Sequence, residues 1–205
     1  MVSSCKVAGI ILAAGEGSRM GTTKQLLPFR GKSVLECVID SALASDLHRV
    51  VVVLGHQADR LIPMMKGKEV EVVVNPRYRE GQSTSLKAGL EALSVETDAA
   101  LFLLADQPLI TPVLIGGILN AYRTSGNPIV LPEFEGRRGN PVLFSRETFP
   151  RIEALAEDCG ARPLFQEYAG RLLTVPVYGP AIHFDIDTME DYRRLLEQEG
   201  KGCRA

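Results

Sequence analysis

Residues 7–28 read VAGIILAAGEGSRMGTTKQLLP, an apolar run that leads directly into a loop of small residues carrying two cations. The apolar part, Val7 to Leu12, is far shorter than the roughly 20 residues of a membrane span and predicts a buried strand. Small residues in the loop let the backbone approach a ligand closely, and Arg19 and Lys24 stand where a polyanion could bind. The strand, the loop and the two cations together predict a site for a nucleoside triphosphate.

Apolar runs rich in Val, Ile and Leu alternate with stretches of helical period as far as residue 131. The runs that predict strands are Val7 to Leu12, Arg49 to Leu54, Val70 to Val74, Ala99 to Leu104 and Ile129 to Leu131. The intervening stretches predict helices from Ser33 to Ala44, Ala58 to Met65, Ser83 to Leu93 and Thr111 to Ser125. Ser33 and Glu36 form a capping-box signature, and Pro112 suits a first helical turn. This alternation predicts right-handed βαβ units, helices on both faces of a parallel sheet, and a ligand crevice at the carboxyl ends of the strands.

The alternation weakens after Pro132, and shorter elements are expected there. A strand at Pro141 to Phe144 precedes a helix that Ser145 could cap and that runs past Pro150. The remaining expected elements are a helix at Ala161 to Tyr168, a strand at Leu172 to Val177, and a helix from Met189 to about Glu199 with Thr188 as its cap.

Length and composition favour a single domain over residues 1–205. The formal net charge of −2 gives no overall field that would attract nucleic acid or an anionic membrane, so we expect neither as a partner. The four cysteines, Cys5, Cys37, Cys159 and Cys203, lie far apart and form no C-x-x-C pair. That usage suits a reducing compartment, and we expect a cytoplasmic protein.

Three aspartates stand at positions suited to a metal ion. Asp106 ends the fourth predicted strand, and a carboxylate at a strand end in such a crevice is well placed to hold Mg²⁺. Asp185 and Asp187 are two residues apart, which in extended chain puts both on one side, so either could complete the site. Alternatively, Asp106 stabilises a turn, Asp185 lies in a solvated loop and Asp187 favours the positive end of the following helix.

Two further polar segments fall near the expected crevice. Asn75 follows the third strand, and Ser83 and Ser85 open the next helix, where amides and hydroxyls could hold a base, ribose or phosphate. A plain helix cap by either serine fits equally well. Arg137 and Arg138 are expected on a loop, where they could bind the phosphate of a second substrate or simply face solvent.

The glycine spacing Gly15-x-Gly17-x-x-x-Gly21 also resembles that of one class of dinucleotide-binding oxidoreductases. The strand that ends at Leu54 lacks an acidic residue for a ribose hydroxyl, and the two cations after the glycines favour a triphosphate. An NADPH-binding oxidoreductase is therefore the less favoured interpretation.

From Gly9 to Tyr192 the chain resembles the molybdopterin nucleotidyltransferases, the MobA-like group. The resemblance is carried by these motifs in order: Leu12-Ala13-Ala14-Gly15, Arg19-Met20-Gly21, Lys24-x-Leu-Leu-Pro28, Asn75-Pro76, Gly81-x-x-x-Ser85-Leu86, Asp106-x-Pro108, Arg138-Gly139-x-Pro141-Val142, Gly160-Ala161-Arg162 and Asp185-Ile186-Asp187-Thr188. Ala14 is similar to the cytidylyltransferase branch, since the guanylyltransferase branch usually has a second glycine there. The chain departs from the group at Asn140, where many relatives have histidine, and at Met189, where proline is usual.

The resemblance implies a three-layer α/β/α, Rossmann-like nucleotidyltransferase (GT-A-like) fold with a mostly parallel sheet. It implies that CMP is transferred from CTP to molybdenum-bearing molybdopterin, with Mg²⁺ as the cofactor and Mn²⁺ as the alternative metal. It implies that the nucleotide is contacted by Leu12, Ala13, Ala14, Gly15, Gly55, Asn75, Ser83 and Ser85. It implies catalytic roles for Arg19, Lys24 and Asp106, and metal binding by Asp106 with Asp185 or Asp187. It implies that the acceptor is bound by Arg138, Asn140 and Arg162.

The resemblance also allows alternatives. The nucleotide could be GTP, or the acceptor another phosphorylated molecule; a non-catalytic molybdopterin chaperone is a more distant alternative. A molybdenum hydroxylase-type enzyme or its chaperone would be the transient partner that receives the product.

Overall fold

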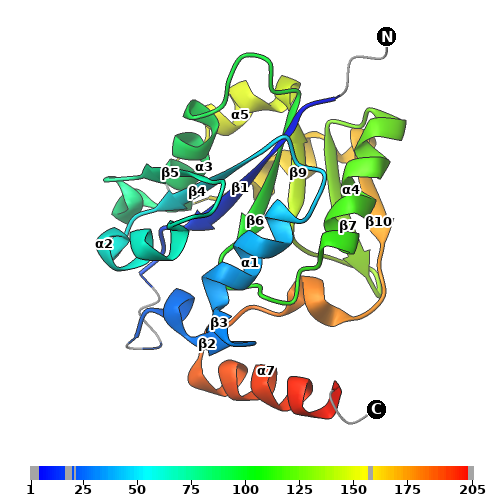
Figure 1. Cartoon of the computed structure of the whole chain (residues 1–205). Coiled ribbons are helices and arrows are strands. Elements are labelled where there is room, and N and C mark those ends of the chain that lie inside the picture. Colours follow the sequence, from blue (N-terminus) through cyan, green and yellow to red (C-terminus); the bar gives the residue numbers. More distant parts are fainter. Residues whose placement is uncertain (1–4, 17–19, 21, 157–158, 203–205) are drawn as a thin grey trace.

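The described part of the chain is built around one sheet of eight strands, with helices packed against both of its faces (Figure 1). The computed structural model describes residues 5–16, 20, 22–156 and 159–202. The strands of the sheet are β1 (Val7–Ala13), β4 (Arg49–Leu54), β5 (Glu71–Val74), β6 (Ala99–Leu104), β7 (Ile129–Phe134), β8 (Arg137–Arg138), β9 (Val142–Ser145) and β10 (Leu172–Pro176). A separate small hairpin consists of β2 (Pro28–Phe29) and β3 (Lys32–Ser33).

The sheet is mostly parallel, as expected from the sequence. Its strand order is β10-β7-β9-β6-β1-β4-β5, with β8 paired to β7. The neighbours β1–β4, β1–β6, β4–β5 and β7–β10 are parallel, whereas β9 runs antiparallel to both β6 and β7. The loops that follow β1, β4 and β6 therefore meet at one edge of the sheet, where ligands bind in open α/β sheets.

Helices cover the sheet on two sides. The α-helices are α1 (Val34–Leu43), α2 (Ala58–Leu61), α3 (Gln82–Glu91), α4 (Pro112–Ser125), α5 (Phe149–Glu153), α6 (Arg162–Glu167) and α7 (Met189–Gly202). Short 3₁₀ helices are η2 (Lys24–Leu26), η3 (Ile62–Met65), η4 (Tyr78–Glu80), η5 (Arg146–Thr148), η6 (Ala169–Arg171) and η7 (Pro180–His183). The result is the three-layer α/β/α arrangement that the sequence predicts.

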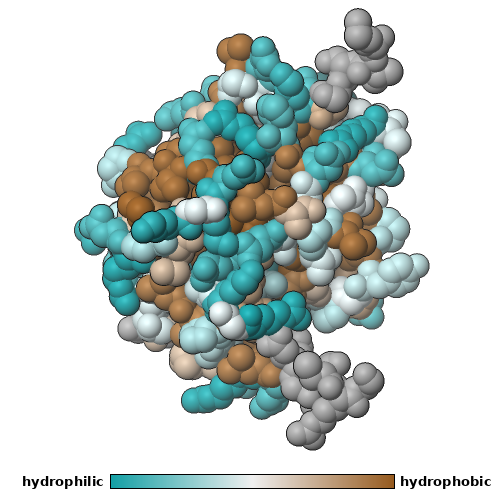
Figure 2. Space-filling model, viewed as in Figure 1, coloured by the Kyte–Doolittle hydropathy of each residue, from teal (hydrophilic) through white to brown (hydrophobic). Residues whose placement is uncertain are grey.

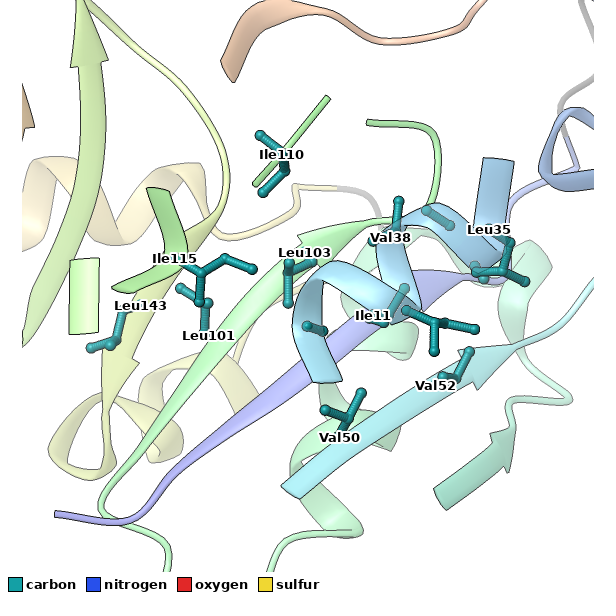
Figure 3. Close-up of a cluster of buried hydrophobic side chains, with 14 of the residues drawn as sticks. Ile11, Leu35, Val38, Val50, Val52, Leu101, Leu103, Ile110, Ile115 and Leu143 are labelled. Atoms are coloured by element: carbon teal, nitrogen blue, oxygen red, sulfur yellow. The ribbon is translucent and has the colours of Figure 1, made fainter. Parts of the chain in front are cut away.

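Alternate residues of the central strands pack against opposite helix layers. On the α1 and α4 side, Ile11, Val52 and Leu101 contact the buried faces of those helices (Figure 3). On the α3, α5 and α6 side, the sheet contributes Ile10 and Phe102. This two-residue alternation is the pattern of a strand buried on both faces, and it explains why these strands read as continuous apolar runs.

Most of the helix-start signals in the sequence are present in the structure. Ser33 accepts a hydrogen bond from the Glu36 amide while the Glu36 carboxylate accepts one from the Ser33 amide, so the capping box is complete. Thr111 caps α4 through the Leu114 amide, and Thr188 accepts from the amide of Asp191 at the start of α7. None of the helices in the described part of the chain has the length and apolar character needed to cross a bilayer.

Two local predictions were wrong. Residues 136–141 were expected to form a loop, but Arg137 and Arg138 form β8, antiparallel to the end of β7. Glu135 and Gly136 both have positive φ, 51° and 74°, as a two-residue type I′ turn requires, so the hairpin closes tightly. Ser145 caps no helix: its hydroxyl has no hydrogen-bond partner, and η5 separates it from α5.

The surface on the α1 side is mixed (Figure 2). Hydrophobic residues reach this surface on the side of the sheet where β5 forms the edge strand, and the side chain of Val74 there is half exposed. Charged and polar residues separate this area from smaller apolar ones.

Candidate active site

A cleft of about 920 Å³ opens at the carboxyl ends of β1 and β6, between the loops that follow them and the start of α3. It is lined by Leu12, Ala14, Gly15, Glu16, Lys24, Gln25, Tyr78, Arg79, Gly81, Gln82, Ser85, Leu104, Ala105 and Asp106. We call it the nucleotide cleft, after the ligand expected from the sequence. It contains six of the residues that the sequence analysis assigned to a nucleotide, its phosphates or the metal: Leu12, Ala14, Gly15, Lys24, Ser85 and Asp106.

The loop after β1 is held against the loop after β4. The His56 amide donates to the Ala14 carbonyl at 3.1 Å, and Gly55 lies between the Ala14 methyl group and Tyr78. A Cβ atom on Gly55 would come within 2.8 Å of the Ala14 Cβ atom, so only glycine fits there without movement. Gly55 and the buried Ala13 are not lining residues of the cleft, and Gly55 shapes its wall by letting Tyr78 approach. Arg19 lies outside the described residues.

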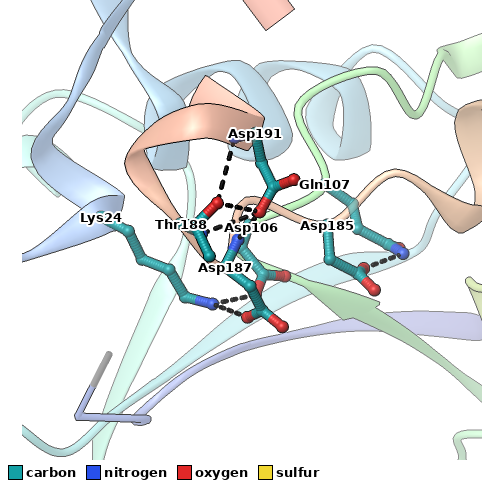
Figure 4. A network of polar contacts seen from close by, with 7 residues as sticks. All are labelled: Lys24, Asp106, Gln107, Asp185, Asp187, Thr188 and Asp191. Carbon is teal, nitrogen blue, oxygen red and sulfur yellow. Dashed lines mark hydrogen bonds and ion pairs between the residues drawn. The ribbon is translucent and has the colours of Figure 1, made fainter. Parts of the chain in front are cut away.

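Lys24 lies between two carboxylates from distant parts of the chain (Figure 4). Its Nζ atom is 2.5 Å from Asp106 Oδ2 and 3.2 Å from Asp187 Oδ1. Burial opposes the charge on Lys24, but the attraction and hydrogen bonds of the two carboxylates outweigh that effect and raise its pKa. Lys24 is therefore held as an ammonium ion in the lining of the nucleotide cleft.

The two aspartates of the C-terminal loop have different partners. Asp185 Oδ1 accepts a hydrogen bond of 2.6 Å from Gln107 Nε2, whereas Asp187 faces Lys24 (Figure 4). Burial and the nearby carboxylate of Asp106 raise the pKa of Asp185, against the smaller opposing effect of the Gln107 hydrogen bond. Thus the pair that the sequence analysis treated as equivalent is divided, with Asp187 on the Lys24 side and Asp185 on the Gln107 side.

Asn75 and Ser83 lie behind the cleft wall. The Asn75 amide donates to the hydroxyls of Thr84 and Ser85 at 2.8 and 3.1 Å, and its oxygen accepts from the Arg77 amide. Asn75 and Ser83 are buried and absent from the lining residues, while Ser85 reaches the cleft. The hydrogen bonds of Asn75 hold the turn before α3 in shape, so any contribution it makes to ligand binding is indirect.

A second pocket of about 270 Å³ adjoins the first and shares Leu12, Gln82 and Leu104 with it. All three residues assigned to an acceptor, Arg138, Asn140 and Arg162, line this acceptor pocket, and so does Asp185. Its other lining residues are Leu86, Phe102, Gly139, Val142, Phe144, Gly160, Ala161 and Phe165. The pocket therefore combines two guanidinium groups with an apolar, aromatic wall.

Sequence reasoning did not assign several residues that shape these pockets. The Phe144 and Phe165 rings are parallel within 8°, with centroids 6.3 Å apart, and Phe102 meets Phe144 edge-on. These phenylalanines come from β6, β9 and α6, and no local pattern distinguishes them from ordinary core residues. Tyr78 and Arg79 were also missed, although their place three and four residues after Asn75 could have drawn attention to them.

The carboxylates around Lys24 offer the kind of oxygen donors that a divalent cation takes. Asp106 Oδ1 is buried and has no hydrogen-bond partner, so one oxygen is available to a cation. No group of three or more His, Cys, Asp or Glu residues among those described is placed to hold a metal ion. One or two carboxylates are sufficient for Mg²⁺, because this ion usually keeps several waters and binds substrate phosphates as well.

The chain is similar to a known protein family and to characterised proteins over most of its length. Residues 9–172 match the family described as MobA-like NTP transferase domain. The chain is 30% identical over 202 residues to nicotine blue oxidoreductase from Paenarthrobacter nicotinovorans, covering 93% of this chain and 96% of that protein. It is 29% identical over 190 residues to the molybdenum cofactor cytidylyltransferase of Escherichia coli K12, covering 92% and 95% respectively.

A solved structure has the same fold over nearly the whole chain. Rv0371c from Mycobacterium tuberculosis H37Rv is 31% identical and superposes with a TM-score of 0.84, covering 95% of this chain and all of that one. A second crystal structure of Rv0371c is a complex with manganese, with a TM-score of 0.79 and 30% identity over 94% of this chain and 98% of that one.

Proposed function

Because the chain belongs to the MobA-like NTP transferase family, we propose that it transfers CMP from CTP to molybdenum-bearing molybdopterin. The products are molybdopterin cytosine dinucleotide and pyrophosphate. Membership of this family makes the chain a nucleotidyltransferase; the choice of CTP and of molybdopterin is the proposal. Ala14 and the similarity to the Escherichia coli cytidylyltransferase support it.

The observation that carries the proposal is the junction of the two pockets. The nucleotide cleft and the acceptor pocket share three lining residues, with Lys24 and Asp106 in the first and Arg138 and Arg162 in the second. Two substrates bound side by side there would bring an acceptor phosphate towards the α-phosphorus of a nucleotide. Holding two reactants in such an orientation is a large part of what catalysis of this type requires.

Asp106 and Asp187 would hold the metal ion, which we propose to be Mg²⁺, with Mn²⁺ able to replace it. When bound, such an ion neutralises charge on the phosphates and on the departing pyrophosphate. The manganese complex of Rv0371c supports a divalent cation in this fold. Asp185, whose carboxylate faces Gln107 and lines the acceptor pocket, would act on the acceptor side.

In the proposed reaction, a terminal phosphate oxygen of molybdopterin attacks the α-phosphorus of CTP. The new P–O bond forms as the bond to the bridging oxygen of pyrophosphate breaks, and the electron pair leaves with pyrophosphate. Backbone amides of Ala13 to Gly15 would contact the nucleotide, while Lys24 and Arg19 stabilise its phosphates. The attacking oxygen is already ionised near neutral pH, so no general base is required.

Arg138, Arg162 and Asn140 would hold the acceptor. A guanidinium group binds phosphate through two parallel hydrogen bonds, and the phenylalanines of the acceptor pocket offer a surface for a flat heterocycle. We further propose that the chain acts as one domain in the cytoplasm and passes its product to a molybdenum hydroxylase-type enzyme or the chaperone of one.

A pyrophosphate-release assay tests this function. Each of the four ribonucleoside triphosphates would be supplied with Mg²⁺, with and without molybdenum-loaded molybdopterin. We expect release that depends on molybdopterin and is fastest with CTP. Fastest release with GTP would instead identify a guanylyltransferase, and release only with another phosphorylated acceptor would replace molybdopterin.

A second candidate is a reductase that uses NADPH, favoured by the similarity to nicotine blue oxidoreductase over nearly the whole length of both proteins. A dinucleotide would occupy the nucleotide cleft, with the substrate against the phenylalanines of the acceptor pocket. NADPH oxidation in the presence of a flat heteroaromatic acceptor, without pyrophosphate release, would establish this function. Binding of molybdopterin with neither activity would indicate a chaperone.

A further inference from the structure

Lys24 is tied to the two carboxylates that we assign to the metal ion. Its Nζ atom lies 2.5 Å from Asp106 and 3.2 Å from Asp187, and only 12% of its side chain is exposed (Figure 4). The three residues come from η2, from the end of β6 and from the loop before α7. The ammonium group of Lys24 thus bridges two carboxylates from distant parts of the chain.

The bridge makes two roles of Lys24 compete. An ammonium group has three donors, and two of them are directed at Asp106 and Asp187. Only one donor of Lys24 remains for a phosphate. Among the described residues that line the nucleotide cleft, the cations are Lys24 and the more exposed Arg79. A divalent cation between the same carboxylates would repel the ammonium group and supply its partners with a larger charge.

We propose that Lys24 is an internal placeholder for the metal ion: it bridges Asp106 and Asp187 in the metal-free protein, and the metal displaces it towards the phosphates of the nucleotide. This inference rests on the proposed metal-dependent nucleotidyl transfer. Its consequence is that metal and nucleotide promote each other's binding, because the ion releases the cation that the phosphates need. By linkage, the nucleotide must raise metal affinity by the same factor.

A fixed structural ion pair is the competing explanation. In that case Lys24 stays on Asp106 when the metal binds, and its removal leaves a buried carboxylate without a partner and disturbs the site. The two explanations differ in where Lys24 lies once the metal is bound, because only the placeholder role moves it away from Asp106.

The first test measures the binding of Mn²⁺ alone by electron paramagnetic resonance in Lys24→Met. We expect the Mn²⁺ dissociation constant to fall about tenfold, which corresponds to ~1.4 kcal/mol. Lys68→Met is the matched control, because Lys68 Nζ is also 2.5 Å from a carboxylate oxygen, on Asp40, and its side chain is 18% exposed. It removes the same charge but lies outside both pockets, so we expect less than a twofold change.

The second test follows Lys24 directly in the unaltered protein. Reductive methylation, read out residue by residue by mass spectrometry, reports how accessible each lysine is. We expect saturating Mn²⁺ to increase the methylation of Lys24 severalfold and to leave Lys68 unchanged, and we expect CTP added with Mn²⁺ to reverse the increase.

Unchanged or weaker Mn²⁺ binding by Lys24→Met would overturn the placeholder role, and so would methylation of Lys24 that does not respond to Mn²⁺. Equal tightening by Lys24→Met and Lys68→Met would also overturn it, because only net charge would then be at work. The Mn²⁺ measurements involve no acceptor and no turnover. If they succeed while the pyrophosphate assay fails, the proposed reaction is wrong and the placeholder role stands.

Discussion

Replacing Gly55 with alanine should both destabilise the protein and disturb the nucleotide cleft. A Cβ atom at this position would lie 2.7 Å from the Tyr78 Cβ atom and 2.8 Å from that of Ala14. Carbon atoms in contact prefer about 3.5–4.0 Å, so at least one of these neighbours must move by roughly 0.7 Å or more. Tyr78 lines the cleft, and Ala14 belongs to the loop after β1, so either movement changes the shape of the cleft.

The expected cost is that of overpacking, about 1–3 kcal/mol of unfolding free energy. For a chain of this length, each kcal/mol lowers Tm by about 2–4 °C. Differential scanning calorimetry of Gly55→Ala should therefore show a decrease of at least a few degrees, together with a higher KM for the nucleotide.

Gly117→Ala is the matched control. Gly117 lies within α4, where an added Cβ atom meets nothing within 4 Å, and alanine is favoured over glycine in a helix by up to about 1 kcal/mol. We expect this variant to have an unchanged or higher Tm and an unchanged KM. If Gly55→Ala were as stable as Gly117→Ala, the tight packing between the loops after β1 and β4 would not exist in solution. A large loss of stability with an unchanged nucleotide KM would remove Gly55 from the wall of the nucleotide site.

Five further substitutions test other parts of the molecule. Lys24→Ala and Asp106→Ala should each lower turnover by on the order of a hundredfold while far-ultraviolet circular dichroism stays unchanged, and near-normal steady-state rates would exclude these residues from the chemistry. Ala14→Gly should shift the ratio of kcat/KM values from CTP towards GTP; an unchanged ratio would place base selection elsewhere. Gly139→Ala would bring a Cβ atom within 2.6 Å of the Ile182 carbonyl oxygen, so the KM for the acceptor should rise while that for CTP does not, and the opposite outcome would contradict the assignment of the acceptor pocket. Burial raises the pKa of Asp40, but hydrogen bonds and attraction from Lys32 and Lys68 outweigh it and hold the pKa below its ordinary 3.8. The resulting stabilisation is present above pH 3.8 and is lost as the pH falls through the folded-state pKa. Asp40→Asn should therefore lower Tm at pH 6 but progressively less below pH 4, and a Tm difference that does not depend on pH would refute the ion-pair origin.

The regular elements were predictable where local signals and burial agree. The strands β4 and β6 have the residue bounds that their apolar runs predict, and α4 begins at Pro112 and ends before Gly126, whose φ of 66° suits a helix end. The helices α2 and α3 are shorter than predicted, because the helical pattern after Leu61 continues as a 3₁₀ turn and the last residues before Leu93 leave the helix. Patterning identifies elements more securely than it identifies their ends.

Proline led to one misjudged boundary. The apolar run in the sequence predicted a strand that ends at Leu131, just before Pro132. Proline has no amide donor and is uncommon within a sheet. In the structure β7 continues to Phe134, and the Pro132 carbonyl still accepts a hydrogen bond of 2.9 Å from the Gly139 amide. Proline lacks only the amide N–H donor and keeps its carbonyl acceptor. A strand can therefore continue past a proline where the neighbouring strand needs a carbonyl to accept its hydrogen bond. That continuation places Arg138 and Gly139 at the acceptor pocket.

The structure brings many of the residues that the sequence proposes for a site to two adjoining pockets, but the sequence did not predict the contacts among them. The loop after β1, Asp106 and the two C-terminal aspartates each follow or precede an element that the sequence identifies, and parallel topology explains why Lys24 and Asp106 meet. The two-residue spacing of Asp185 and Asp187 places them on one side of the chain, yet it carries no information about which neighbour each one faces. Gln107 decides this, because its amide donates to Asp185 and leaves Asp187 to pair with Lys24. A buried neutral side chain beside Asp106 thus separates the aspartate that we propose for the metal ion from the one that we propose for the acceptor. Its effect becomes visible only once the chain is folded.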